Sequence, residues 1–263
     1  MKITLPEFEI AYEDQGGGVP VLLIHGFPLN RKMWAPQIEQ LSGAGRVLAP
    51  DLRGHGETLP TPAPYSMDML ADDCAAFLEA TGVIQPVVVC GLSMGGYIPL
   101  AFYRRHRSRV AGLILAATRA GADTPEGRAN RDKAAGQVRE LGIRAVVDSM
   151  LPKMMAPITY ASNPELVARV EEIMADTSQE GMVAALLGMK ERPDSTPMLE
   201  QIDAPTLIVH GLDDQLIPVK EAEVMHAAIK NSQLHLLQDA GHLLNLEQPA
   251  LFNQVMGDFL ESF

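Results

Sequence analysis

The sequence feature that most constrains the fold is the stretch Val87-Val88-Val89-Cys90-Gly91-Leu92-Ser93-Met94-Gly95-Gly96-Tyr97. It begins as a β-branched apolar run, which is typical of a strand buried on both faces. It then turns at Gly-x-Ser-x-Gly and continues over residues 97–104 as a predicted helix. Pro99 is expected in the first turn of this helix, where backbone N–H groups have no intrahelical partner.

A serine at such a strand-to-helix turn is expected to have a strained backbone and an exposed Oγ. Gly91 and Gly95 fit positions where a side chain would collide with the closely packed strand and helix. The helix start also directs free N–H groups toward negative charge that develops beside Ser93. The pattern predicts a serine nucleophile, but five common residues can also meet by chance, so the other motifs must decide.

Apolar runs alternate with helical patterns along most of the chain, which predicts βαβ units and a mostly parallel sheet of about eight strands. The first strand is expected to pair antiparallel with a neighbour at one edge. Strands are expected at residues 2–5, 8–13, 19–24, 46–50, from 87 onward, 110–116, 204–210 and 233–237. Flanking helices are expected at residues 31–41, 67–81, 97–104, 219–229 and 248–263.

The pattern changes over residues 119–197, where no strand-like run occurs. Amphipathic helices are expected there at residues 130–141, 143–151, 164–175 and 180–189. The chain is therefore predicted to consist of a core of residues 1–118 and 198–263 and a helical cap of residues 119–197. Methionines in the cap, which adapt to irregular apolar surfaces, either roof a pocket or pack the cap onto the core.

Acyl transfer by a serine needs a base that takes the Oγ proton and an acid that orients the base. His242 follows the last predicted strand, at the sheet edge where ligands bind, and is the favoured base. His25 and His55 lie in loops near the same edge and are expected to brace them. The other histidines are expected to be solvated or structural: His106, His210, His226 and His235.

The acid is expected after the penultimate predicted strand, where Asp213 and Asp214 are adjacent. Asp214 is favoured, and Asp213 is expected to be a solvated turn residue. The loop at residues 117–119 is another place for the acid but contains no carboxylate.

With Ser93, Asp214 and His242 in this chain order, the sequence resembles the α/β-hydrolase family over nearly its full length. The resemblance is carried by four further motifs: His25-Gly26-Phe27-Pro28, Asp51-Leu52-Arg53-Gly54-His55-Gly56, Gly211-x-x-Asp214-x-x-x-Pro218, and Gly241-His242 with Glu247-Gln248-Pro249. The third motif also selects Asp214 over Asp213.

The resemblance implies that Ser93 attacks an ester carbonyl while His242, oriented by Asp214, takes its proton. The backbone N–H groups of Phe27 and Met94 would hold the oxyanion. No metal or organic cofactor is implied. Positions in the chain suggest Leu243, Met150 and Met154 as residues of the substrate pocket.

The leading interpretation is a carboxylesterase for small to medium esters. Alternatives in the same fold are a lactone or enol-lactone hydrolase, a cofactor-free perhydrolase and a hydrolase of carbon–carbon bonds. A non-catalytic ligand-binding receptor is the alternative from another class, because one fold can serve many functions.

The net charge of −12 argues against nucleic acid and anionic membrane surfaces as partners and weakly disfavours polyanionic substrates. The two cysteines, Cys74 and Cys90, are expected in the core of a protein from a reducing compartment, which predicts a cytoplasmic location. A monomer and a homodimer are equally compatible with the sequence.

Overall fold

The structure is a computed structural model that describes residues 1–62 and 64–263. Its strands are β1 (Lys2–Thr4), β2 (Glu9–Gly16), β3 (Val19–Ile24), β4 (Gly45–Pro50), β5 (Val87–Leu92), β6 (Val110–Ala116), β7 (Thr206–Gly211) and β8 (Ser232–Leu237). They form one eight-stranded sheet in the order β1-β2-β4-β3-β5-β6-β7-β8. β2 pairs antiparallel with both β1 and β4 at one edge, and the remaining pairs are parallel. The predicted α/β-hydrolase fold is confirmed.

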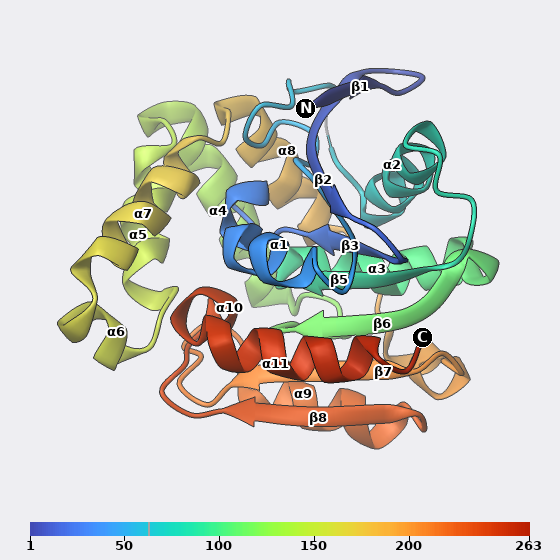
Figure 1. Ribbon diagram of the computed structural model, residues 1–263. Helices are drawn as coiled ribbons and strands as arrows, with labels where there is room; N and C mark the ends of the chain where they lie inside the picture. Colours follow the sequence, from blue (N-terminus) through green and yellow to red (C-terminus); the bar gives the residue numbers. More distant parts are fainter. Residues whose placement is uncertain (63) are drawn as a thin grey trace.

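Helices cover both faces of the sheet (Figure 1). One face carries α1 (Ala35–Leu41), α10 (Leu244–Glu247) and α11 (Pro249–Leu260), and the other carries α2 (Met67–Ala80), α3 (Met94–Arg105) and α9 (Val219–Ala228). Along β5, Val87 and Val89 belong to the core beneath α2 and α3, whereas Val88 and Cys90 belong to the core beneath α1 and α11. Both faces of the strand are buried, which explains its continuous apolar run.

Five α-helices connect β6 to β7: α4 (Pro125–Leu141), α5 (Arg144–Met150), α6 (Pro157–Ser162), α7 (Pro164–Ala175) and α8 (Gln179–Lys190). Two 3-10 helices, η3 (Leu151–Lys153) and η4 (Thr196–Gln201), lie in the same connection. In Figure 1, α4 to α7 gather to one side of the sheet. This arrangement agrees with a helical insertion after the sixth strand, while the division into two domains stays a prediction. Within the described ranges, no helix is both long and apolar enough to cross a lipid bilayer.

Three local predictions need correction. α3 begins at Met94, directly after the turn, so Pro99 lies inside the helix rather than in its first turn. The predicted helix at residues 31–41 is divided into the 3-10 helix η1 (Arg31–Trp34) and α1, which starts anew with Pro36 in its first turn. The helices α6 and α10, of six and four residues, were not predicted, because such short segments show no recognisable helical periodicity of apolar residues.

Candidate active site

Ser93 occupies the sharp turn between β5 and α3, with φ 58° and ψ −117°. A positive φ is unfavourable for a residue with a side chain, so the surrounding packing must hold it in place. Gly91 permits the turn because a Cβ there would collide with the carbonyl oxygen of Gly95. A Cβ on Gly95 would in turn collide with the carbonyl oxygen of Ile24 in β3. The helix start therefore packs against two neighbouring strands.

His242 and Asp214 form a buried hydrogen-bonded pair at the same edge of the sheet. Asp214 follows β7 and His242 follows β8, and the distance from His242 Nδ1 to Asp214 Oδ2 is 2.8 Å. Asp214 Oδ1 accepts hydrogen bonds from the backbone N–H groups of Leu216 at 2.8 Å and Ile217 at 3.0 Å. These bonds fix the carboxylate, which can then orient the imidazole.

The environment of Asp214 favours its ionised form. Burial raises the pKa of this carboxyl. The charge of His242 and the hydrogen bonds from His242 and the two amides together outweigh that effect, so the pKa of Asp214 lies below its usual value. The neighbouring Asp213 is exposed, as expected for a solvated turn residue. His210 lies 3.4 Å from Asp214 Oδ2 and 2.9 Å from the carbonyl oxygen of Ile217. Burial lowers the pKa of His210, which favours a neutral structural imidazole.

Ser93 and His242 line one cavity of about 120 Å³. Its other lining residues are Phe27, Tyr97, Arg119, Arg131, Met150, Met189, Leu216 and Ile217. Of the three suggested pocket residues, Met150 lines this cavity. Leu243 and Met154 are fully buried in the core instead, where the Leu243 N–H donates to the Met154 carbonyl at 3.0 Å. They stabilise the loop that carries His242 and do not line the cavity.

The two suggested oxyanion donors come from different parts of the chain. Met94 is the first residue of α3, so its N–H has no intrahelical acceptor. Phe27 follows β3 and lines the cavity. Within residues 1–62 and 64–263, neither backbone N–H donates a hydrogen bond to another residue. Both donors are therefore available to a ligand.

The two arginines of the cavity wall were not predicted as site residues from the sequence. Arg119 follows β6 at the carboxyl edge of the sheet, so the rule that ligands bind at this edge could have indicated it. Arg131 lies on α4, far from any recognisable motif. Its place in the wall depends on how α4 packs against α5 and α8.

Glu247 links the His242 loop to the segment before α6. Its Oε1 accepts from the Gly241 N–H at 2.9 Å. Its Oε2 accepts from the Ala156 N–H and the Thr159 hydroxyl, both at 2.7 Å. Burial raises the pKa of Glu247 above its usual value, although these bonds partly oppose the rise. This carboxylate holds the loop that presents His242.

His25 and His55 are fully buried beside each other, with ring centroids 5.0 Å apart. His25 Nε2 accepts from the Leu52 N–H at 2.9 Å, and His55 Nδ1 lies 2.8 Å from the Arg53 carbonyl oxygen. Burial lowers the pKa of His25 to about 4 and that of His55 to about 3, so both are neutral at pH 7. They brace two loops, as expected from the sequence.

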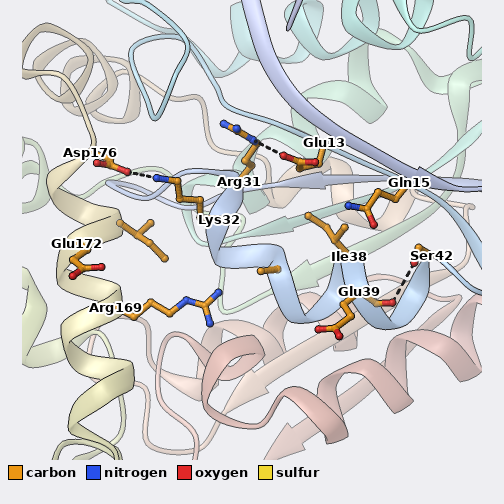
Figure 2. Close-up of a pocket in the computed structure, with 12 residues that line it drawn as sticks. Glu13, Gln15, Arg31, Lys32, Ile38, Glu39, Ser42, Arg169, Glu172 and Asp176 are labelled. Carbon is orange, nitrogen blue, oxygen red and sulfur yellow. Dashed lines mark hydrogen bonds and ion pairs between the residues drawn. The ribbon is translucent and has the colours of Figure 1, made fainter. Parts of the chain in front are cut away.

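A larger groove of about 890 Å³ lies elsewhere, between η1, α1 and α7 (Figure 2). Two ion pairs join charged side chains of this groove, Arg31 with Glu13 at 3.4 Å and Lys32 with Asp176 at 2.6 Å. None of Ser93, Asp214 and His242 lines this groove. The smaller cavity beside Ser93 is therefore the better candidate for chemistry.

Comparisons with known proteins agree on one family. A family model of the alpha/beta hydrolase fold matches residues 19–249. The chain is 42% identical to a thermophilic esterase from Thermogutta terrifontis solved with malate bound, with a TM-score of 0.96 and coverage of 100% of this chain and 98% of that one.

Two further similarities point to ester and lactone chemistry in relatives. The enol-lactonase from Burkholderia xenovorans is 28% identical, has a TM-score of 0.92 and is matched over 99% of this chain and 100% of that chain. A pimeloyl-[acyl-carrier protein] methyl ester esterase of Neisseria meningitidis is 30% identical over 92% of this chain and 93% of the relative.

Proposed function

This chain belongs to the α/β-hydrolase family, in the branch with esterases and enol-lactonases, and from this premise we propose that it is a serine carboxylesterase. One observation carries the proposal. Ser93, held at positive φ in the strand-to-helix turn, lines the same cavity as His242, and His242 Nδ1 is 2.8 Å from Asp214. A nucleophile, a base and an orienting acid are the parts that acyl transfer requires.

In the proposed acylation step, Ser93 Oγ attacks the ester carbonyl while His242 Nε2 takes the hydroxyl proton. Asp214 accepts the Nδ1–H hydrogen bond, which keeps Nε2 free as the base and stabilises the imidazolium that forms. The N–H groups of Phe27 and Met94 stabilise the negative charge on the carbonyl oxygen. His242 then donates the proton to the departing alcohol, and an acyl-enzyme remains on Ser93.

Deacylation repeats these steps with water as the nucleophile. His242 takes a proton from water, the hydroxide attacks the acyl carbonyl, and Ser93 leaves with the proton returned by His242. The cavity of about 120 Å³ accommodates a short acyl or alcohol group, so we expect small esters to react best. We further propose that residues 119–197 act as a cap, since Arg119, Arg131, Met150 and Met189 all come from this segment.

Lactone hydrolysis is the second candidate, favoured by the similarity to enol-lactonases. A lactone is a cyclic ester, so the same groups would open it, with the alcohol remaining attached to the product. Substrate preference therefore separates the two candidates, whereas the identity of the nucleophile does not.

The test is hydrolysis of p-nitrophenyl esters of increasing acyl length, with a simple lactone measured in parallel. We expect turnover of short-chain esters by the native protein and a loss of at least ~10⁴-fold in Ser93→Ala. His242→Asn should show a comparable loss, while the exposed His226→Asn serves as the matched control. Lactone opening without ester turnover would favour the second candidate. Folded protein that hydrolyses neither would contradict the proposal and favour a binding role.

A further inference from the structure

A second cavity, of about 220 Å³, adjoins the cavity beside Ser93 and shares part of its wall. Arg119, Arg131 and Met150 line both of them. The second cavity is otherwise lined by residues of α4, α5 and α8, among them Asn130, and by Asp123, which precedes α4. A ligand whose reacting carbonyl lies at Ser93 and whose far end enters the second cavity would pass both guanidinium groups.

The charges around this passage are unbalanced. Asp123 forms ion pairs with three arginines: Arg119 at 2.8 Å, Arg131 at 3.1 Å and Arg192 at 2.9 Å. Among the described residues that line the two cavities, Asp123 is the only acid. Against the effect of burial, the negative charge of Glu221, which lines neither cavity, raises the pKa of Arg119. Asp123 thus forms ion pairs with three guanidinium groups, in a protein whose net charge is −12.

Burial separates the roles of the three arginines. The side chains of Asp123 and Arg192 are 1% and 2% exposed, and Arg192 also donates to two carbonyl oxygens and stacks 4.2 Å above the Tyr97 ring. Arg192 is therefore structural. The side chains of Arg119 and Arg131 are 27% and 22% exposed and form the cavity wall.

The two wall arginines retain unused hydrogen-bond donors. The Nε of Arg119 is buried and has no partner among the described residues. Arg131 donates to Asp123 through Nε, and its two terminal nitrogens donate to no other described residue. Leaving the buried Arg119 Nε without a partner is unfavourable, and an incoming anion would satisfy it together with the terminal nitrogens of Arg131.

We propose that the substrate is an ester that also carries a carboxylate, which Arg119 and Arg131 bind in the passage between the two cavities. The inference rests on the proposed function and names the substrate class of that site. Guanidinium groups bind carboxylates through paired, charge-assisted hydrogen bonds. The half-ester of a short dicarboxylic acid has this chemistry, with the ester carbonyl at Ser93 and the free carboxylate at the arginines.

The kinetic test compares the monomethyl esters of succinic, glutaric and adipic acids with their carboxamide isosteres, in which a neutral amide replaces the free carboxylate. We expect kcat/KM to favour the carboxylate by at least ~10-fold for one of these chain lengths. Arg131→Gln and Arg119→Gln should each reduce this ratio. Arg128→Gln is the matched control, because Arg128 lies on the same helix but pairs at 3.4 Å with the exposed Glu191. The inference would be overturned if the native protein had nearly equal kcat/KM values for the half-ester and its carboxamide. It would also be overturned if neither Arg119→Gln nor Arg131→Gln changed the ratio of these values.

Binding to Ser93→Ala tests the same inference without turnover. Calorimetric titration should show at least ~10-fold tighter binding of the preferred half-ester than of its carboxamide, and added salt should reduce the difference. Arg131→Gln in this background should remove it. Equal affinities would overturn the inference even if the native protein hydrolyses neutral esters. Anion-selective binding together with no hydrolysis by the native protein would instead contradict the proposed function and leave the inference standing.

Discussion

At the scale of single residues, Asp213 and Asp214 are chemically identical neighbours in very different environments. Asp214 is buried and accepts from His242 and two backbone amides, whereas Asp213 is exposed. We therefore expect Asp214→Asn to lower kcat by ~10²- to 10⁴-fold, because an amide can hold His242 in the wrong tautomer. Asp213→Asn should leave kcat within about twofold. Equal effects in steady-state kinetics would contradict the assignment of the acid.

The buried histidines predict how stability depends on pH. The pKa of His25 is about 4 and that of His55 about 3, against 6.5 for an unperturbed histidine. Below pH 6.5 the unfolded chain therefore binds more protons than the native protein, and the free energy of unfolding falls as the pH is lowered. From pH 7 to pH 5 each histidine should remove about 2 kcal/mol of stability.

Urea denaturation of the native protein and of a His25→Asn/His55→Asn double variant measures this effect. The double variant is expected to be less stable at pH 7 but to lose stability more slowly between pH 6.5 and pH 4. His226→Asn, on an exposed helix, should keep the native slope. If the double variant also keeps the native dependence of stability on pH, other groups cause the acid sensitivity of the fold.

Residue roles could be predicted wherever the chain carries the information locally. Ser93, with its flanking glycines, and His242, after the last strand, could be recognised from position and order. Arg119 could have been indicated only by its position after β6, and Arg131 could not be recognised, because arginines are common on surfaces. The placement of Arg131 beside Ser93 results from the packing of α4 against α5 and α8. Leu243 and Met154 were suggested by position alone, and position does not determine on which side of a loop a side chain lies.

At the scale of secondary structure, the connection through Glu247 joins the His242 loop to α6. Glu247→Ala would leave the N–H groups of Gly241 and Ala156 and the hydroxyl of Thr159 without an acceptor. Each unpaired buried group costs about 1 kcal/mol or more, so we expect a loss of about 3 kcal/mol in the free energy of unfolding. Glu261→Ala, at the exposed chain end, is the control. A loss below about 1 kcal/mol in urea denaturation would show that water replaces the carboxylate.

The turn that carries Ser93 gives a second prediction at this scale. Gly95→Ala places a methyl group against the carbonyl oxygens of Ile24 and His25, and neither backbone segment can move without disturbing β3. We expect a loss of stability of about 3 kcal/mol or more together with loss of activity. Gly136→Ala, at a position in α4 with open space around it, should be neutral or slightly stabilising. Comparable melting temperatures for the two variants would contradict the packing argument.

Long elements were easier to predict than short ones. The buried strands β3 and β6 and the helix α7 match their predicted ranges, because apolar runs and helical periodicity are strong signals. The start of α3 was placed too late, since the tight turn leaves no loop between Ser93 and the helix. The single-turn helices α6 and α10 are held by tertiary contacts, such as the bonds from Glu247, which the sequence does not display.

At the scale of the whole molecule, the sheet order follows from parallel βαβ connections, which allow few arrangements. It brings the loops after β3, β5, β7 and β8 to one edge, although Phe27, Ser93, Asp214 and His242 are far apart in the sequence. The arrangement of α4 to α8 obeys no comparable rule. The nature of the chemistry was therefore predictable, whereas the shape and charge of the substrate cavity were not.

The most direct test of the central claim is labelling with a fluorophosphonate, which reacts covalently with an activated serine, followed by peptide mass spectrometry. We predict one adduct per chain, located on Ser93, no adduct in Ser93→Ala and much slower labelling in His242→Asn. Heat-denatured protein should remain unlabelled. Labelling of Ser93→Ala at the native rate, or an adduct mapped to another residue, would contradict the claim that Ser93 is the nucleophile.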